Sequence, residues 1–240
     1  GTFTPRRFVC SGAVIYAGSG QRDVIATAGH CVHNGLGNRG TNGGWSYDVQ
    51  FCPSYYAGGV APAIGCWNYA ALVTKNGWIN GGNPNGLEYD VGCVVARNTG
   101  TRRSAHIGDV TGTLGRAWNY GADEPVTAFG YPAGSPFPGY NIQMVPGVEW
   151  YTRSFGAAAD AKYMGNDMTG GSSGGPWVLG LGRSAGSGEW GDTDGNPATD
   201  PPGTGTPGWR NAGGYINGVN SHRRSDRSQE MGSAQFNNTS

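Results

Sequence analysis

Short apolar segments rich in β-branched and aromatic residues recur along the whole chain, and turn residues separate them. Helical periodicity is nearly absent, and its best stretch, 157–164, fits either two helical turns or a loop. Asn-Gly pairs, which favour tight turns, stand at 34–35, 42–43, 76–77, 80–81 and 85–86. The pattern predicts an all-β protein, an antiparallel sandwich or barrel. Strands are expected at 8–17, 23–28, 46–51, 68–74, 91–96, 125–131, 148–155, 176–181 and 214–220.

Two polar stretches without periodicity interrupt this series of strands. The stretch 97–112 is the best internal boundary, and we expect two domains, 1–105 and 106–240. The stretch 184–213 is long for a loop in a compact domain, and we interpret it as an inserted surface loop. Two roles stay open for this loop: a cover over a functional site, or a decoration without a role.

Composition changes this picture in two ways. Among 240 residues there are 46 Gly and 14 Pro, but 8 Trp, 12 Tyr and 7 Phe provide enough apolar surface for a folded core. The formal net charge is zero, with 16 basic and 16 acidic side chains, so we expect neither nucleic acid nor an anionic membrane as a partner. No apolar run approaches the ~18 residues that a membrane span needs.

Five cysteines bear on the compartment. None lies in a C-x-x-C pair, and Cys93 sits in an apolar run, where it behaves as a small buried hydrophobe. The remaining four flank two loop-containing stretches, which predicts the disulfides Cys10–Cys31 and Cys52–Cys66. The alternative is a cytosolic protein with five reduced thiols. Scarce lysine and Gly-rich loops favour export, and a chain that begins at Gly1 without an apolar leader is interpreted as a mature exported protein.

The strongest candidate for chemistry is a serine among glycines, at Gly170-Gly171-Ser172-Ser173-Gly174-Gly175-Pro176. Glycines leave the Ser173 hydroxyl uncovered and let backbone N–H groups turn toward a common point. Preformed donors of this kind are what a tetrahedral oxyanion requires. The alternative is a flexible turn, since glycine is abundant throughout the chain.

Two further residues fit this chemistry. His30 follows a β-branched run and precedes Cys31, whose predicted disulfide would hold the imidazole in place. Asp90 stands at the mouth of an apolar strand, where a carboxylate is costly unless it accepts hydrogen bonds. An imidazole N–H is a natural donor to it. Taken singly, each residue is more often structural than catalytic.

In the chain order His30, Asp90, Ser173, the sequence resembles the trypsin/chymotrypsin-like serine peptidases. The likeness is greatest to the secreted microbial branch that contains the glutamyl endopeptidases. The matching pieces span most of the chain: Val9-Cys10-Ser11-Gly12, Thr27-Ala28-Gly29-His30-Cys31, Tyr89-Asp90-Val91-Gly92, Phe129-Gly130-Tyr131-Pro132 and Gly171-Ser172-Ser173-Gly174-Gly175-Pro176.

The resemblance implies two six-stranded antiparallel β-barrels of the chymotrypsin type, with the active site in the cleft between them. The barrel 1–105 would carry His30 and Asp90, and the barrel 106–240 would carry Ser173. By the logic of the triad, Ser173 is the nucleophile, His30 the general base, Asp90 its partner, and the N–H groups of Gly171 and Ser173 the oxyanion hole. We therefore expect a secreted, monomeric serine endopeptidase that acts on polypeptides, accepts proteinaceous inhibitors as partners, and needs no cofactor or metal.

The primary specificity pocket (S1) is less well defined. The resemblance places its floor near Asp167 and its wall at 219–222. A buried carboxylate at the floor favours Arg or Lys substrates, but glutamyl-specific relatives also carry Asp at this spacing. Those relatives have a His at the position that matches Val219, so a preference for acidic substrates has no support from this segment. The candidate S1 residues are Asp167, Thr169, Asn220, Ser221 and His222.

Two other functions compete with the peptidase. Gly171-x-Ser173-x-Gly175 also fits the nucleophile elbow of an esterase or lipase, but that fold needs a helix after the serine, and the Gly-Gly-Pro that follows Ser173 predicts a strand. A catalytically inactive binding module is the other alternative, and the intact triad argues against it. The animal peptidases have Asp where this chain has Ser172, so their zymogen switch does not carry over.

Overall fold

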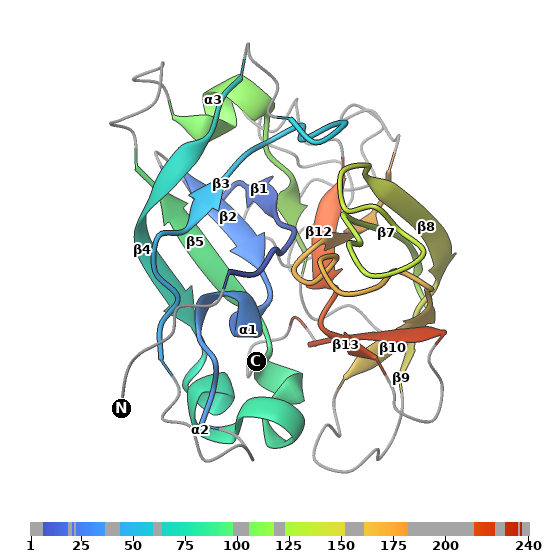
Figure 1. The fold of residues 1–240 in the computed structure, drawn as a ribbon. Helices are drawn as coiled ribbons and strands as arrows, with labels where there is room; N and C mark the ends of the chain where they lie inside the picture. The colour runs from blue at the N-terminus through green and yellow to red at the C-terminus, as the bar shows by residue number, and fades with distance from the viewer. Residues whose placement is uncertain are drawn as a thin grey trace.

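The computed structural model is predominantly β-structure, with a few short helices (Figure 1). The part of the chain that the structure describes contains sheets of five, four and five strands. The structure describes residues 7–18, 21, 23–36, 44–59, 64–97, 106–117, 123–151, 161–181, 214–223, 229–234 and 236.

The first sheet has the order β1-β2-β5-β4-β3, and every neighbouring pair is antiparallel. Burial alternates along β5, as expected of a strand with one face on a core. That core contains Trp67, Ile25 and Val94. The strands are β1 (Ala13–Ile15), β2 (Val24–Thr27), β3 (Gln50–Phe51), β4 (Trp67–Thr74) and β5 (Gly92–Ala96).

Three short helices and one 3-10 turn lie beside this sheet, none of which was predicted. The reason is composition: α2 (Asn76–Asn85) contains Pro84 and several glycines, and its backbone is interrupted at Gly82 and Asn83. The other elements are too short for a helical period to show. They are α1 (Gly29–Val32), the 3-10 turn η1 (Leu87–Tyr89) and α3 (Ile107–Thr111).

Two further sheets follow in the second half of the chain. The five-stranded sheet has the order β6-β12-β11-β7-β8, in which β6 and β12 are parallel and the other pairs antiparallel. The four-stranded sheet has the order β13-β14-β10-β9. The strands are β6 (Gly115–Arg116), β7 (Pro125–Gly130), β8 (Gln143–Val148), β9 (Trp150–Tyr151), β10 (Lys162–Gly165), β11 (Pro176–Leu179), β12 (Tyr215–Val219), β13 (His222–Arg223) and β14 (Glu230–Ser233).

The core of this half surrounds Trp177, Met164 and Met168. It also contains an ion pair of two fully buried groups, in which Lys162 Nζ lies 2.7 Å from Glu149 Oε1. The chain has only two lysines, and one of them, Lys162, is fully buried in the interior.

The expectations from sequence are confirmed in their coarse form. The chain is mostly β, and each of the nine predicted segments contains strand residues. Two details were wrong: β6 pairs in parallel with β12, and residues 162–164, expected to form helical turns or a loop, belong to β10. The stretch 97–112 contains α3, whose Ile107 packs in the core of the first sheet. The expected loop at 184–213 lies outside the described residues.

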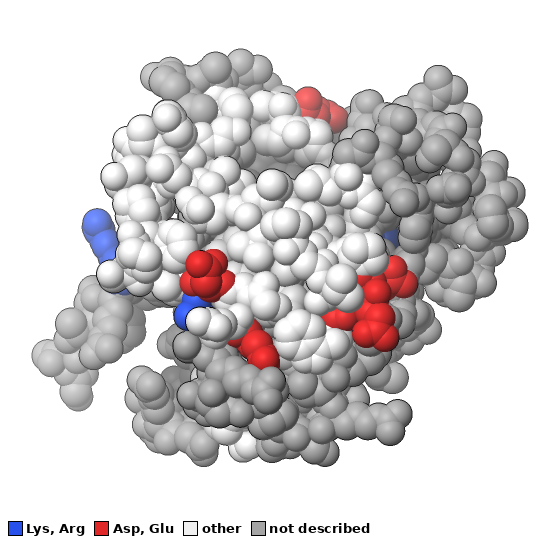
Figure 2. Space-filling view, turned by 90° about the vertical axis from the view of Figure 1, so that its right-hand side faces the viewer, with Lys and Arg blue, Asp and Glu red and all other residues white. Residues whose placement is uncertain are grey.

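Charge is sparse on the face shown in Figure 2, where uncharged residues make up most of the described surface and acidic side chains form small separate groups. Within the described residues, no helix is both long and apolar enough to cross a membrane.

Candidate active site

His30 and Asp90 form a tight pair at the end of the first sheet. The chain leaves β2 and turns at once into α1, so that His30 follows a buried strand. Its ring Nδ1 lies 2.8 Å from Asp90 Oδ2, and its backbone N–H donates to Asp90 Oδ1 at 2.7 Å. Gly29 makes room for this contact, because a Cβ there would lie 3.0 Å from Asp90 Oδ1 and 2.8 Å from Thr74 Oγ1.

Asp90 is fully buried, yet its contacts with His30 favour the ionised carboxylate and the protonated imidazole. Burial by itself raises the pKa of Asp90, but the charge of His30 and hydrogen bonds from His30 and Ser221 outweigh it, so the pKa lies below its ordinary value. Burial by itself lowers the pKa of His30, but the charge and hydrogen bond of Asp90 outweigh it, so this pKa is raised. The imidazole is therefore a base strengthened by a fixed carboxylate.

The loop formed by residues 170–175, called the Ser173 loop below, has two backbone N–H groups without an acceptor among the described residues. The N–H groups of Ser172, Gly174 and Gly175 donate to carbonyls, whereas within the described residues those of Gly171 and Ser173 have no acceptor. Gly171 has φ +100°, a conformation that favours glycine and that turns this peptide. The two free donors are the pair that the sequence assigned to the oxyanion hole, and they are available to a ligand.

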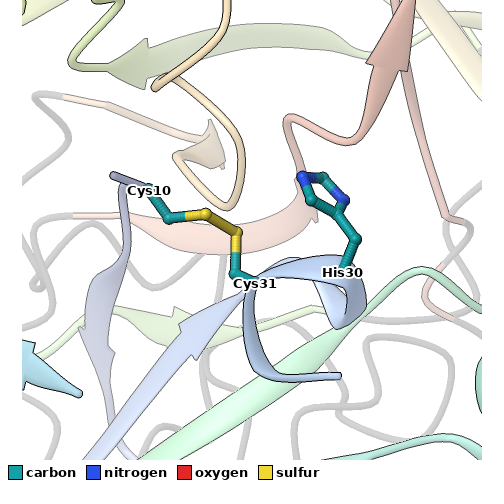
Figure 3. A group of neighbouring side chains, drawn as sticks. All are labelled: Cys10, His30 and Cys31. Atoms are coloured by element: carbon teal, nitrogen blue, oxygen red, sulfur yellow. A yellow bond between two sulfur atoms is a disulfide. The ribbon is translucent and has the colours of Figure 1, made fainter. Parts of the chain in front are cut away.

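Ser11 and the first disulfide bring this loop against the first half of the molecule. The Ser11 N–H donates to the Ser173 carbonyl at 2.7 Å, and its hydroxyl donates to the Gly171 carbonyl at 2.9 Å. Cys31 Sγ lies 3.7 Å from the same Ser173 carbonyl. Figure 3 shows the His30 imidazole beside the disulfide of Cys10 and Cys31. Ser173 is thus packed against Cys31, the residue next to His30.

The hydroxyl of Ser173 does not hydrogen-bond the His30 ring among the contacts of the described residues. In catalytic sites without a substrate such hydrogen bonds are often long or poorly aligned, and they tighten when a substrate binds. The His30 side chain is 30% exposed, so its outer ring nitrogen is open to an approaching group.

Both predicted disulfides are present, Cys10–Cys31 and Cys52–Cys66. Cys10, His30 and Cys31 also place three potential metal-ligating atoms within 4.8 Å of one another. Sulfurs joined in a disulfide are not thiolates, so this group does not have the donors that zinc needs. Cys93 is half-buried, and burial raises the pKa of its thiol to about 11, which keeps it protonated and unreactive.

The predicted S1 residues divide into three kinds. Asp167 is exposed, so it is not the buried carboxylate on which a preference for basic substrates was argued. Asn220 is fully buried, and its amide binds the carbonyls of Phe129 and Ser172 while its oxygen accepts from Trp177. Thr169 exchanges hydrogen bonds with Gly134. Asn220 and Thr169 therefore brace the loop that leads to Ser173.

Ser221 and His222 belong to the Asp90 side of the site. The Ser221 hydroxyl donates to Asp90 Oδ2 at 2.5 Å and lies 2.9 Å from His222 Nδ1. The other ring nitrogen of His222 is engaged by the Tyr163 hydroxyl at 2.8 Å. Tyr163 was missed by sequence reasoning, because nothing near it in the chain indicates a site.

Arg223 was also missed. It is half-buried, and its Nε donates to the Met168 carbonyl at 2.9 Å, with Nη2 on the same oxygen. Met168 lies five residues before Ser173 in the chain. Within the described residues Arg223 forms no ion pair, which makes it a cation beside the Ser173 loop without an acidic partner.

The geometry agrees with known structures, although no family model and no curated protein matches the sequence. Protease Anisep from Arthrobacter nicotinovorans has 27% identity and a TM-score of 0.71, over 96% of this chain and 84% of that one. The thermostable serine protease AL20 from an extremophilic microorganism has 26% identity and the same TM-score, over 96% and 85%.

A Glu endopeptidase structure has 17% identity and a TM-score of 0.61, over 96% of this chain and 80% of that one, a likeness in fold alone. Together these neighbours confirm the resemblance to the trypsin/chymotrypsin-like serine peptidases of the microbial branch. They support peptidase activity in general.

Proposed function

We propose that this protein is a secreted serine endopeptidase that uses His30, Asp90 and Ser173 and passes through an acyl-enzyme intermediate. Its fold would be two six-stranded barrels, 1–105 and 106–240, with the site between them. The first five-stranded sheet falls within the former range and the other two sheets within the latter, which supports this division. Two disulfides support an extracellular location.

The reaction begins with attack by Ser173 on a peptide carbonyl. His30 takes the hydroxyl proton on its outer ring nitrogen, while its Nδ1–H stays on Asp90. The charge of Asp90 stabilises the imidazolium that forms, in line with the raised pKa of His30. The developing oxyanion accepts hydrogen bonds from the N–H groups of Gly171 and Ser173.

Collapse of the tetrahedral intermediate completes the first half of the reaction. His30 gives its proton to the leaving amine, the peptide C–N bond breaks, and the acyl group remains on Ser173 Oγ. Water then attacks the ester with His30 again as base, which releases the acid and restores the hydroxyl. We propose polypeptides as the substrates and a monomer as the active form.

One observation carries the proposal: a buried carboxylate holds His30 beside a loop whose serine is flanked by two unused N–H donors. The esterase alternative lacks support, because Ser173 is followed by strand β11 and not by a helix. An inactive binding module is disfavoured, since it would not need the donors, the base and the carboxylate together.

The direct test is Ser173→Ala, assayed on denatured casein and on peptide para-nitroanilides. We expect turnover to fall by at least about three orders of magnitude, with the melting temperature unchanged, because only the nucleophile is lost. An organophosphorus reagent should label the wild type and not the variant. Ser54→Ala is the matched control, since Ser54 is an exposed serine in a turn of the first half of the chain.

Full activity in Ser173→Ala would refute the proposed nucleophile. Hydrolysis of simple esters without any casein turnover would favour the esterase, and a folded wild type that neither turns over substrate nor accepts the label would favour the binding module.

A further inference from the structure

Four side chains form a continuous series of hydrogen bonds, which begins at Tyr163 on the four-stranded sheet and ends at the Asp90 carboxylate. Tyr163 on β10 contacts His222 Nε2 at 2.8 Å, and His222 Nδ1 contacts Ser221 Oγ at 2.9 Å. Ser221 Oγ contacts Asp90 Oδ2 at 2.5 Å. Asp90 and Ser221 are 131 residues apart in sequence, so only the folded structure connects these groups.

The direction of each hydrogen bond follows from the chemistry of the groups. An ionised carboxylate only accepts, so the single Ser221 proton must point at Asp90. The Ser221 oxygen is then the acceptor toward His222, which requires the hydrogen on Nδ1. A neutral imidazole has one N–H, so Nε2 must accept from the Tyr163 hydroxyl. Every donor in the chain therefore points toward Asp90.

The surroundings of His222 keep its ring neutral. Burial lowers the pKa of His222 to about 4, the charge of His30 lowers it as well, and Asp90 opposes both. Among the described residues, Asp90 and His30 are the charged groups that act on this ring. Tyr163 on β10 packs edge-on against the ring, and a Cβ at Gly232 on β14 would lie 2.5 Å from it. The ring is thus closely packed and fixed in orientation.

We propose that His222 and Tyr163 are positioning residues of this catalytic site, which hold the Ser221 proton on Asp90 and thereby set the basicity of His30. The inference rests on the proposed function, because it assigns a task in the same triad. His222 does not face the substrate, since both its ring nitrogens are engaged. Hydrogen bonds in such a chain polarise one another, so the distant Tyr163 hydroxyl affects the carboxylate.

Loss of the Tyr163 hydroxyl removes the bond that selects the tautomer of His222. The ring is then free to carry its hydrogen on Nε2, and Nδ1 competes with Asp90 for the one Ser221 proton. An Asp90 carboxylate with fewer donors concentrates its charge and stabilises the imidazolium of His30 more strongly. The basic form of His30 therefore appears at higher pH.

The experiment measures the ring titration of His30 by NMR in a Ser173→Ala background, which needs no turnover. Tyr163→Phe is expected to raise the titration midpoint of His30, and in the active enzyme to lower kcat about three- to tenfold at neutral pH with little change in KM. Tyr69→Phe is the matched control, because Tyr69 packs in the core of the first sheet, away from the chain of hydrogen bonds.

A second variant distinguishes positioning from packing. His222→Asn keeps a donor toward Ser221 and has nothing equivalent to Nε2, so it should retain more activity than His222→Leu. In the His222→Asn background, Tyr163→Phe should have no further effect on kcat or on the His30 midpoint. The concentration of active sites is measured by titration with the organophosphorus reagent. Each rate is divided by that concentration, so that misfolded protein does not affect the comparison.

The proposal is overturned if Tyr163→Phe changes only the melting temperature and leaves the His30 titration as in wild type. It is also overturned if the effects of the two substitutions simply add. An inactive wild type in which Tyr163→Phe still moves the His30 titration would instead refute the proposed function and keep the positioning role.

Discussion

Two fully buried carboxylates, one in each half of the chain, meet a basic side chain at similar distance, but their pKa values shift in opposite directions. Asp90 lies 2.8 Å from the His30 ring, and Glu149 lies 2.7 Å from the Lys162 ammonium. The pKa of Asp90 is lowered, whereas burial raises the pKa of Glu149 despite its lysine. Burial likewise lowers the pKa of Lys162.

The difference lies in how the oxygens are used. Both oxygens of Asp90 accept hydrogen bonds, from the His30 backbone, the His30 ring and Ser221. Glu149 Oε1 accepts from Lys162 and Asn217, while Oε2 has no partner among the described residues. Because both carboxylates are fully buried, the number and placement of their donors decide the direction in which each pKa shifts.

The largest expected effect comes from removing the charge of Asp90. Asp90→Asn should lower kcat by about four orders of magnitude, the size of loss known for this change in such triads, because an amide leaves the imidazole in the wrong tautomer. Steady-state kinetics on a para-nitroanilide measures it. Glu149→Gln is the comparison, and it should leave kcat within a few-fold of wild type. Equal losses in the two variants would remove the distinction between the carboxylates.

The second pair should respond in stability. Lys162→Met is expected to lower the free energy of unfolding by about 3–5 kcal/mol, since it leaves Glu149 buried without its cation. Urea unfolding followed by Trp fluorescence measures it. Combining it with Glu149→Gln should recover most of the loss, because neither partner is then charged. A single variant as stable as the wild type would mean that Glu149 is already neutral.

The pH dependence of the reaction tests the raised pKa of His30. The pKa of His30 is raised above 6.5, and the base must be neutral, so the acidic limb of kcat/KM should have its midpoint above pH 6.5. By the same shift, the pair's contribution to stability is fully present below pH 6.5 and declines as pH rises through the pKa of the folded protein. A pH–rate profile tests the first statement, and a midpoint at or below 6.5 would contradict it.

Arg223 extends the comparison to a charge that forms no ion pair with any acidic residue in the described part of the chain. Because like charges repel, substrates with Arg or Lys before the scissile bond should be cleaved less efficiently than those with Gln. Arg223→Gln should reduce that discrimination about two- to fivefold, measured as a ratio of kcat/KM values. Arg97→Gln, at an exposed arginine of the first half, is the control. An unchanged ratio would limit Arg223 to bracing Met168.

The sequence was sufficient for the elements with strong local patterns. β2, β5 and β11 are mostly apolar and contain no charged residue, and the motifs around His30, Asp90 and Ser173 led to the residues of the candidate site. β8 was missed because Pro146 and Gly147 break its apolar pattern, although an edge strand tolerates both. β13 contains only His222 and Arg223, which is too short to show a period.

Contacts between segments that are distant in the sequence could not be predicted from local patterns. Asn220 and Ser221 are adjacent, yet one braces the Ser173 loop and the other binds Asp90. Side chains alternate along an extended backbone, so a shift of one residue exchanges these roles. The likeness to relatives identified the segment but not which side chain faces which partner. Asp167 shows the same limit, since its spacing indicated a pocket floor and its exposure does not.

The disulfide Cys10–Cys31 has a consequence for where the protein can work. It joins the residue before Ser11, which holds the Ser173 loop, to the residue after His30. A reductant that opens this one bond loosens the segments that hold Ser173 and His30, whereas Cys52–Cys66 joins neither segment. We therefore expect thiols to abolish the proposed peptidase activity at concentrations that leave the protein folded, so that the proposed enzyme would be active only in oxidising surroundings.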